Sequence, residues 1–182
     1  MSGTGLKIRL YGDRALRRKS KVVKQVSEEI RALLSEMSRL MYAGSGIGLA
    51  APQVGVGLAL IVADIGNGLY KLVNPKVVKK EGSQSLEEGC LSIPGICLKV
   101  KRAKKILVQA EDEFAKPVSL EAEGLLACVL QHEIDHLKGK LIVDYASFLD
   151  KLKIKRKLEE LKKKAKDERV PEQSGKSCQL QL

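Results

Sequence analysis

Apolar residues recur at helical spacing in a segment close to the start of the chain. Six of them lie three or four residues apart: Ile30, Leu33, Leu34, Met37, Leu40 and Met41. This spacing puts them on one face of a helix. Ser27 can cap that helix, and Glu28 and Glu29 suit its first turn, where the helix dipole favours negative charge. The pattern predicts a helix that runs to about Tyr42 and ends where a glycine-rich stretch begins.

The middle of the chain is rich in aliphatic and β-branched residues, and turn signals such as Asn74-Pro75 and Pro94-Gly95 divide it. Five strands are predicted there: Leu58–Ile65, Leu69–Val73, Ile96–Lys101, Lys105–Ala110 and Pro117–Ala122. Strands in the middle of the chain with helices at both ends predict an α+β domain.

Two more helices are predicted in the last third of the chain. Gly124 opens an apolar helix from Leu125 to about Lys138, which Gly139 ends. The other predicted helix begins at Phe148, extends to about residue 169 and is highly charged, with a thin apolar stripe, so we expect it on the surface. We therefore expect one main domain over residues 1–147, a basic C-terminal helix of the same domain over 148–170, and a disordered tail over 171–182.

Composition limits the kind of protein. The chain has 182 residues and a net charge of +11, with 33 Lys and Arg against 22 Asp and Glu. The basic excess is concentrated near the C-terminus, which suits either an ordinary solvated surface or a polyanionic partner such as RNA. Because we find neither a signal-peptide pattern nor an apolar run long enough for a bilayer, we expect a cytoplasmic protein with no membrane contact. The four cysteines form no CxxC pair, so we expect thiols or metal ligands and no disulfide.

The strongest local signal is the sequence His132-Glu133-Ile134-Asp135-His136. Positions i and i+4 of a helix lie on one face, so both imidazoles can bind one divalent ion. Glu133 directly follows the first ligand and can reach a water at that ion. The alternative is a pair of surface histidines, but the apolar residues that precede the motif indicate a buried helix.

A catalytic metal site needs a third protein ligand and an open position for water. The remaining candidates are Cys, Asp and Glu, and Cys90 is the best of them. It lies in the segment Glu88-Gly89-Cys90-Leu91-Ser92, just before a predicted turn, where Gly89 lets the backbone approach closely. We expect Cys97 and Cys128, which lie inside apolar runs, to pack as small apolar side chains.

The segment Gly46-Ile47-Gly48-Leu49-Ala50-Ala51 fits the loose GxGxxA pattern of dinucleotide-binding proteins. That pattern should follow a strand and open a helix, whereas this segment follows a helix. We therefore expect its glycines to expose backbone groups to an extended ligand that docks as an added strand. A plain flexible loop is the alternative.

Three segments together resemble the signature motifs of the peptide deformylase family, in the family's order: residues 46–53, 88–92 and 131–136. The resemblance extends from about Ile8 to the C-terminal helix. It implies an α+β fold with mixed or antiparallel sheets around the helix that carries the HExxH ligands. It also implies a metal-dependent hydrolase that removes the N-formyl group from the N-terminal methionine of nascent polypeptides and releases formate.

The resemblance assigns roles to individual residues. It implies that Cys90, His132 and His136 bind the metal and that Glu133 is the general acid and base. Gln53 and the backbone N–H of Leu91 would hold the oxyanion. Gly46 and Gly48 match the family's substrate-binding strand, and Ile47, Leu125, Cys128 and Val129 are candidates for a methionine pocket. The implied metal is Fe2+, while the ligand set also suits Zn2+, Ni2+ or Co2+.

Some features depart from the family or leave other functions open. Gly12 stands where the family often has proline, and the arginine that many members carry near Cys97 is missing, which puts affinity for short peptides in question. The basic C-terminal helix resembles an extension by which some members dock on the ribosome. Two other interpretations are a zinc endopeptidase of the HExxH type and a basic, ribosome-associated protein whose metal only holds the fold together.

Overall fold

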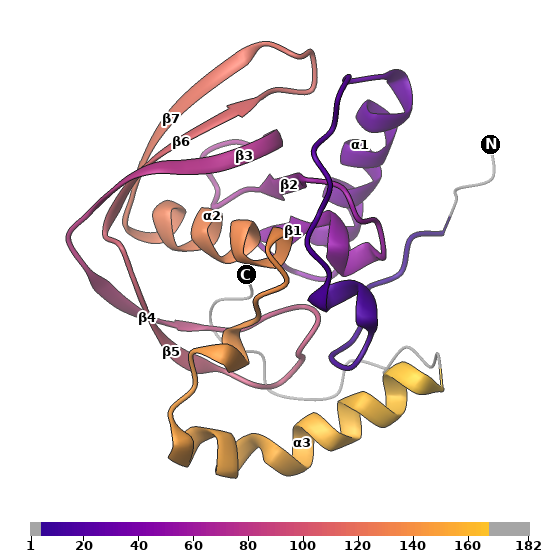
Figure 1. Cartoon of the computed structure of the whole chain (residues 1–182), viewed down its shortest axis with the longest axis vertical. Coiled ribbons are helices and arrows are strands. Elements are labelled where there is room, and N and C mark those ends of the chain that lie inside the picture. The colour runs from indigo at the N-terminus through magenta and orange to yellow at the C-terminus, as the bar shows by residue number, and fades with distance from the viewer. Residues whose placement is uncertain (1–4, 168–182) are drawn as a thin grey trace.

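The computed structural model describes residues 5–167, which are arranged around one central helix, α2 (Figure 1). Its helices are α1 (Glu28–Ala43), α2 (Gly124–Leu137) and α3 (Phe148–Lys166), with shorter 3₁₀ turns η1 (Arg14–Arg17), η2 (Ala51–Val54) and η3 (Ile142–Asp144). Its strands are β1 (Gly48–Ala50), β2 (Leu60–Ala63), β3 (Tyr70–Glu81), β4 (Gln84–Glu88), β5 (Leu98–Arg102), β6 (Lys105–Glu111) and β7 (Pro117–Glu123).

All strand pairs are antiparallel, and they form two sheets. One sheet has five strands in the order β1-β2-β3-β6-β7, and β4 and β5 form a separate pair. In Figure 1 the long strands β3, β6 and β7 arch over one side of α2, and β4 and β5 lie on its other side. The α+β fold with antiparallel sheets is therefore confirmed, and α2 contains the sequence His132-Glu133-Ile134-Asp135-His136.

Side-chain alternation places β1 and β2 between two helices. Ala50 and Ile61 pack in an apolar cluster with α2, whereas Leu49 and Leu60 pack in another cluster with α1. Successive strand side chains point to opposite faces, so a strand covered on both faces carries apolar residues at every position. All four residues of β2 are accordingly buried.

The third apolar cluster attaches α3 to the rest of the protein. Leu161 of α3 is buried in this cluster with Leu98 and Val100 of β5 and Ile142 of η3. Lys157 also donates a hydrogen bond from Nζ to the backbone oxygen of Gly95 at 2.6 Å. The basic helix therefore packs on the protein with one side and presents its other side to solvent.

The prediction that Asn74-Pro75 ends a strand is wrong, because β3 continues to Glu81. The pairing of β3 with β6 shifts register between Val73 and Lys76, and proline is tolerated in a sheet at such an irregularity. Asn74 has a φ of 54°, and its side chain bonds both the N–H and the carbonyl of Val23. The Asn74-Pro75 pair therefore marks a β-bulge, which is hydrogen-bonded to the N-terminal segment through Val23.

Some predictions lie partly or wholly beyond the described residues. The end of the predicted C-terminal helix and the tail 171–182 lie outside residues 5–167, and the division of the chain at residue 147 stays a prediction. The hydrophobic pattern predicts neither β1 nor β4, and the family resemblance alone implies a strand at Gly48. In the described part of the chain, none of the helices combines the length and the apolar character needed to cross a membrane.

Candidate metal centre

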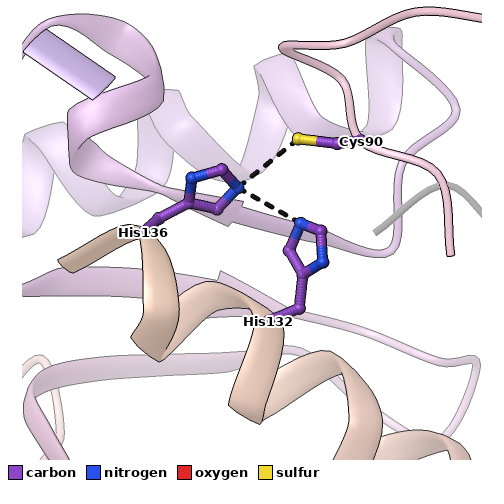
Figure 2. Close-up of side chains that lie close together, drawn as sticks. All are labelled: Cys90, His132 and His136. Carbon is purple, nitrogen blue, oxygen red and sulfur yellow. Dashed lines mark hydrogen bonds between the residues drawn. The ribbon is translucent and has the colours of Figure 1, made fainter. Parts of the chain in front are cut away.

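Helix α2 and the loop after β4 bring three metal-ligand side chains to one point. His136 Nε2 lies 3.2 Å from His132 Nε2 and 3.4 Å from Cys90 Sγ, as Figure 2 shows. All three ligand atoms lie within 4.8 Å of one another, and all three residues are buried. One thiolate and two imidazoles so arranged form a donor set that can hold a single divalent ion.

A buried acid–base pair fixes the orientation of the first imidazole. Glu88 at the end of β4 accepts a hydrogen bond from His132 Nδ1 at 3.0 Å, which leaves Nε2 to face the other two ligands. Arg102 of β5 binds both oxygens of Glu88, with Nη2 to Oε2 at 2.8 Å. Burial alone would raise the pKa of Glu88, but the hydrogen bonds from His132 and Arg102 outweigh it and hold that pKa at about 2.

The ionisation of the three side chains suits a cation. Burial lowers the pKa of His132 and lowers that of His136 well below its usual value, so both rings are neutral, the form that binds metals. Burial and the neighbouring Glu133 carboxyl raise the pKa of the Cys90 thiol to about 12. A cation beside the sulfur is therefore what would stabilise a thiolate there.

Glu133 lies near the Cys90 thiol, with a carboxyl group that has no hydrogen-bonding partner among residues 5–167. Both its oxygens are buried without a hydrogen bond from the described residues, and burial raises its pKa well above the usual value. A side chain at Gly48 on β1 would collide with this carboxyl group, so only glycine lets the strand lie so close. A buried acid kept unpaired beside a possible metal site is available for proton transfer.

Gln53 of η2 also faces this site, and its amide has a defined orientation. The backbone N–H of Ala50 donates to Gln53 Oε1 at 2.7 Å, so the amide nitrogen points the other way. That Nε2 lies 3.5 Å from Cys90 Sγ and 3.3 Å from Ser92 Oγ. The side chain thus presents an N–H donor beside the sulfur of Cys90.

The comparisons with known proteins agree on one family. The polypeptide deformylase family model matches residues 6–152. The peptide deformylase of Caldicellulosiruptor bescii is 51% identical over 138 residues, which cover 76% of this chain and 83% of that protein. That of Acetivibrio thermocellus is 46% identical, covering 84% of this chain and 90% of the relative. The crystal structure of a Legionella pneumophila peptide deformylase superimposes with a TM-score of 0.82 at 44% identity and covers 91% of this chain and 98% of that one.

This chain belongs to the polypeptide deformylase family. In this chain the four methionine-pocket candidates lie together in one apolar cluster: Ile47 and Leu125 are partly buried, and Cys128 and Val129 are buried. Cys128 does more than pack as a small apolar side chain, because its Sγ also lies 3.0 Å from Glu88 Oε1. Leu91 lies beside the glycine-rich segment, where a Cβ on Gly46 would approach Leu91 Cδ1 to 2.8 Å.

The structure adds site residues that sequence reasoning missed, namely Glu88 as the partner of His132, Arg102 as the partner of Glu88, and Ser92 as a partner of Gln53. Glu88 lies two residues before Cys90 in the sequence, so the sequence already placed it close to the predicted metal ligand. The sequence also contains a sign of Arg102: residues alternate between the two faces of strand β5, so Arg102 points inward with Leu98 and Val100. An arginine at an inward position predicts a buried acidic partner.

Proposed function

We propose that this chain is a metal-dependent hydrolase that removes the N-formyl group from the N-terminal methionine of newly synthesised polypeptides and releases formate. The observation that carries the proposal is the convergence of Cys90, His132 and His136 with the unpaired carboxyl group of Glu133. This arrangement lies in a chain of the deformylase family.

Cys90, His132 and His136 would hold one divalent ion, and we propose Fe2+ by family resemblance, with Zn2+, Ni2+ and Co2+ as other ions that these donors accept. When bound, the ion supplies a Lewis acid and lowers the pKa of water toward about 7. Glu88 supports the proposal because it holds His132 in the tautomer that directs Nε2 at the site.

Glu133 would move the proton of the reaction. Its carboxylate accepts a proton from the attacking water and returns it to the departing amine, which would otherwise be a poor leaving group. The buried position of Glu133, without a hydrogen-bonding partner among the described side chains, supports this role. A carboxyl group already held by an arginine could not take up and release a proton at neutral pH.

Gln53 and the backbone N–H of Leu91 would stabilise the oxyanion that forms at the formyl carbon. Gln53 is suited to this because the Ala50 N–H fixes its amide with the nitrogen toward Cys90. Donors that are oriented before the reaction stabilise the developing charge without the cost of reorganisation.

The peptide would dock as an extra strand on β1. That strand is at the edge of the five-stranded sheet, where β2 is its one partner among the described strands, so its other edge can accept an extended chain. Gly46 and Gly48 keep side chains out of the space beside Leu91 and Glu133. The cluster of Ile47, Leu125, Cys128 and Val129 offers an apolar surface for the methionine side chain.

We also propose that α3 docks this cytoplasmic enzyme on the ribosome. Several of its basic residues are exposed: Lys151, Lys153, Lys155, Lys163 and Lys164. Positive charge on one solvent-facing helix favours the phosphates of RNA.

Formate release from a formyl-methionyl peptide by anaerobically purified protein tests the main proposal. We expect release by the wild type and a loss of about 10²-fold to 10⁴-fold in Glu133→Ala, with metal content unchanged, because Glu133 moves protons and is not a ligand. Cleavage of unformylated peptides, or equal formate release by both proteins, would contradict the proposal.

A further inference from the structure

A continuous series of hydrogen bonds joins Tyr145, which is not a metal ligand, to His132. The Tyr145 hydroxyl donates to Asp135 Oδ2 at 2.6 Å, and the same oxygen accepts from Arg102 Nη1 at 2.9 Å. The other edge of the Arg102 guanidinium binds Glu88, whose Oε2 lies 3.0 Å from His132 Nδ1. Each member therefore contacts the next, from the end of η3 to the metal centre.

Tyr145 acts on the orientation of Arg102 in two ways. It holds the carboxylate that Arg102 binds, and its ring lies under the guanidinium, 5.3 Å from Cζ to the ring centroid. The guanidinium is a planar, rigid fork, so a tilt at its Asp135 end also turns the edge that faces Glu88. The position of Glu88 in turn sets the ring of His132.

Burial distinguishes Tyr145 from the other members. Arg102 is 7% exposed and Glu88 is fully buried, whereas Tyr145 is 40% exposed. Removing Arg102 or Glu88 would leave a buried charge without its partner and disturb the fold. Removing the Tyr145 hydroxyl leaves both charges paired, so its effect on the metal centre can be measured in a folded protein.

We propose that Tyr145 is a positioning residue for the metal centre, acting on His132 through Asp135, Arg102 and Glu88. This inference rests on the metal site of the proposed function. It also links α3 to that site, because Tyr145 lies between η3 and the start of α3 at Phe148.

The test compares full-length wild type and Tyr145→Phe after each is loaded with Co2+. The phenylalanine keeps the ring under Arg102 and removes only the hydroxyl. Loss of a group that directly supports a ligand typically weakens metal binding about 10-fold to 100-fold. Because Tyr145 lies further out, we expect Co2+ loss to a chelator to be about threefold to tenfold faster, with a shift of the visible cobalt bands.

Tyr42→Phe is a matched control. Its hydroxyl also donates to an aspartate, Asp64 Oδ2, at 2.7 Å, and Tyr42 is also about half exposed. Among residues 5–167 the Asp64 carboxylate accepts hydrogen bonds from Tyr42 and from the backbone of Gly66 and Gly68, none of which is a metal ligand. We therefore expect wild-type bands and a wild-type rate of Co2+ loss in this variant.

A double variant tests the route. If Tyr145 acts through Asp135, Tyr145→Phe should add nothing to the faster Co2+ loss of Asp135→Asn. Fully additive effects of the two substitutions on the rate of Co2+ loss would overturn this inference. A Tyr145→Phe protein that loses Co2+ no faster than Tyr42→Phe would do the same, and both outcomes would leave the proposed metal site intact. A wild-type chain that binds no Co2+ would overturn the proposed metal site and this inference with it.

Discussion

Arg102 is the buried cation on which Glu88 depends. The Arg102 side chain is 4% exposed and that of Glu88 is fully buried, and Arg102 also binds Asp135. Burial would lower the pKa of Arg102, but hydrogen bonds to Glu88 and Asp135 outweigh it and raise that pKa. A buried pair of this kind adds little to stability as a whole, but the loss of one partner leaves the other charge without compensation.

We therefore expect Arg102→Met to lower the free energy of unfolding of the chelator-treated protein by about 3–5 kcal/mol at pH 7. The pKa of Glu88 is about 2 in the folded protein, below its usual 4.5. Its stabilising contribution is therefore complete above pH 4.5 and is lost as the pH falls toward 2. In Arg102→Met the buried Glu88 carboxylate is destabilising at pH 7, and protonation removes its charge. The difference in free energy of unfolding between wild type and variant should therefore be smaller at pH 3. Urea unfolding at both pH values measures this.

Arg17→Met is the control for that measurement. Arg17 pairs with Asp144 at 2.6 Å, but the two side chains are 43% and 37% exposed. Exposed pairs typically contribute about 1 kcal/mol or less. Equal losses in both variants, or a loss in Arg102→Met that does not change with pH, would contradict the role given to Arg102.

Residue-level prediction from sequence succeeds where the geometry is local. The i and i+4 spacing of His132 and His136 follows from the helix alone, and the structure brings Cys90 to the same point. Alternation along β5 turns Arg102 inward, but its contacts with Glu88 and Asp135 depend on the pairing of β5 with β4 and on the position of α2. Such contacts join distant parts of the chain, and single-sequence patterns do not contain them.

At the scale of secondary-structure elements, β1 lies close to α2 at Gly48. A Cβ there would lie 2.9 Å from Glu133 Cδ, so Gly48→Ala must displace either the strand or the carboxyl group. A displacement of about 1 Å in a reacting group can cost about 10²-fold in rate. We expect kcat for formate release to fall by about that factor in Gly48→Ala, measured by steady-state kinetics.

Gly57→Ala serves as the comparison, because a Cβ at Gly57 would meet no atom within 4 Å. It makes the same chemical change in open space, so we expect a kcat close to that of the wild type. A normal kcat in Gly48→Ala, or an equal loss in both, would show that the contact between β1 and Glu133 does not govern the reaction.

The positive charge of α3 should govern ribosome binding. We expect reversal of three exposed lysines to weaken ribosome binding and to flatten its salt dependence, because fewer counterions are released: Lys151→Glu, Lys155→Glu and Lys163→Glu. The control reverses the same charge elsewhere: Lys7→Glu, Lys24→Glu and Lys116→Glu. Sedimentation with ribosomes at several salt concentrations measures both. Equal weakening of ribosome binding by the two sets of substitutions would show that binding depends on net charge and not on α3.

Element boundaries show where sequence patterns are ambiguous. The predicted helices agree with α1 and α2 within a residue or two, because their apolar spacing is sustained over several turns. The short strand β1 follows a glycine-rich stretch and was not recognised from the hydrophobic pattern, and Asn74-Pro75 indicated a turn although it lies at a bulge. Three residues of strand show too little alternation to be distinguished from a loop.

At the scale of the whole molecule, the candidate metal centre lies between two apolar clusters. Helix α2 packs against the five-stranded sheet, whereas Cys90 belongs to the cluster that holds β5 and α3. An ion between Cys90 and the two histidines would tie these two clusters together. The order of strands and helices predicted the α+β class, but the placement of α2 between the two sheets came from family resemblance, because packing is set by tertiary contacts.

The central claim is that one ion is held by one sulfur and two imidazole nitrogens, with a position left for solvent. X-ray absorption at the zinc edge of the zinc-loaded protein tests it most directly. We predict one sulfur at about 2.3 Å and three nitrogen or oxygen neighbours at about 2.0–2.1 Å, with the sulfur absent in Cys90→Ala. A site without sulfur, with two sulfurs, or with the sulfur retained in Cys90→Ala would contradict the account.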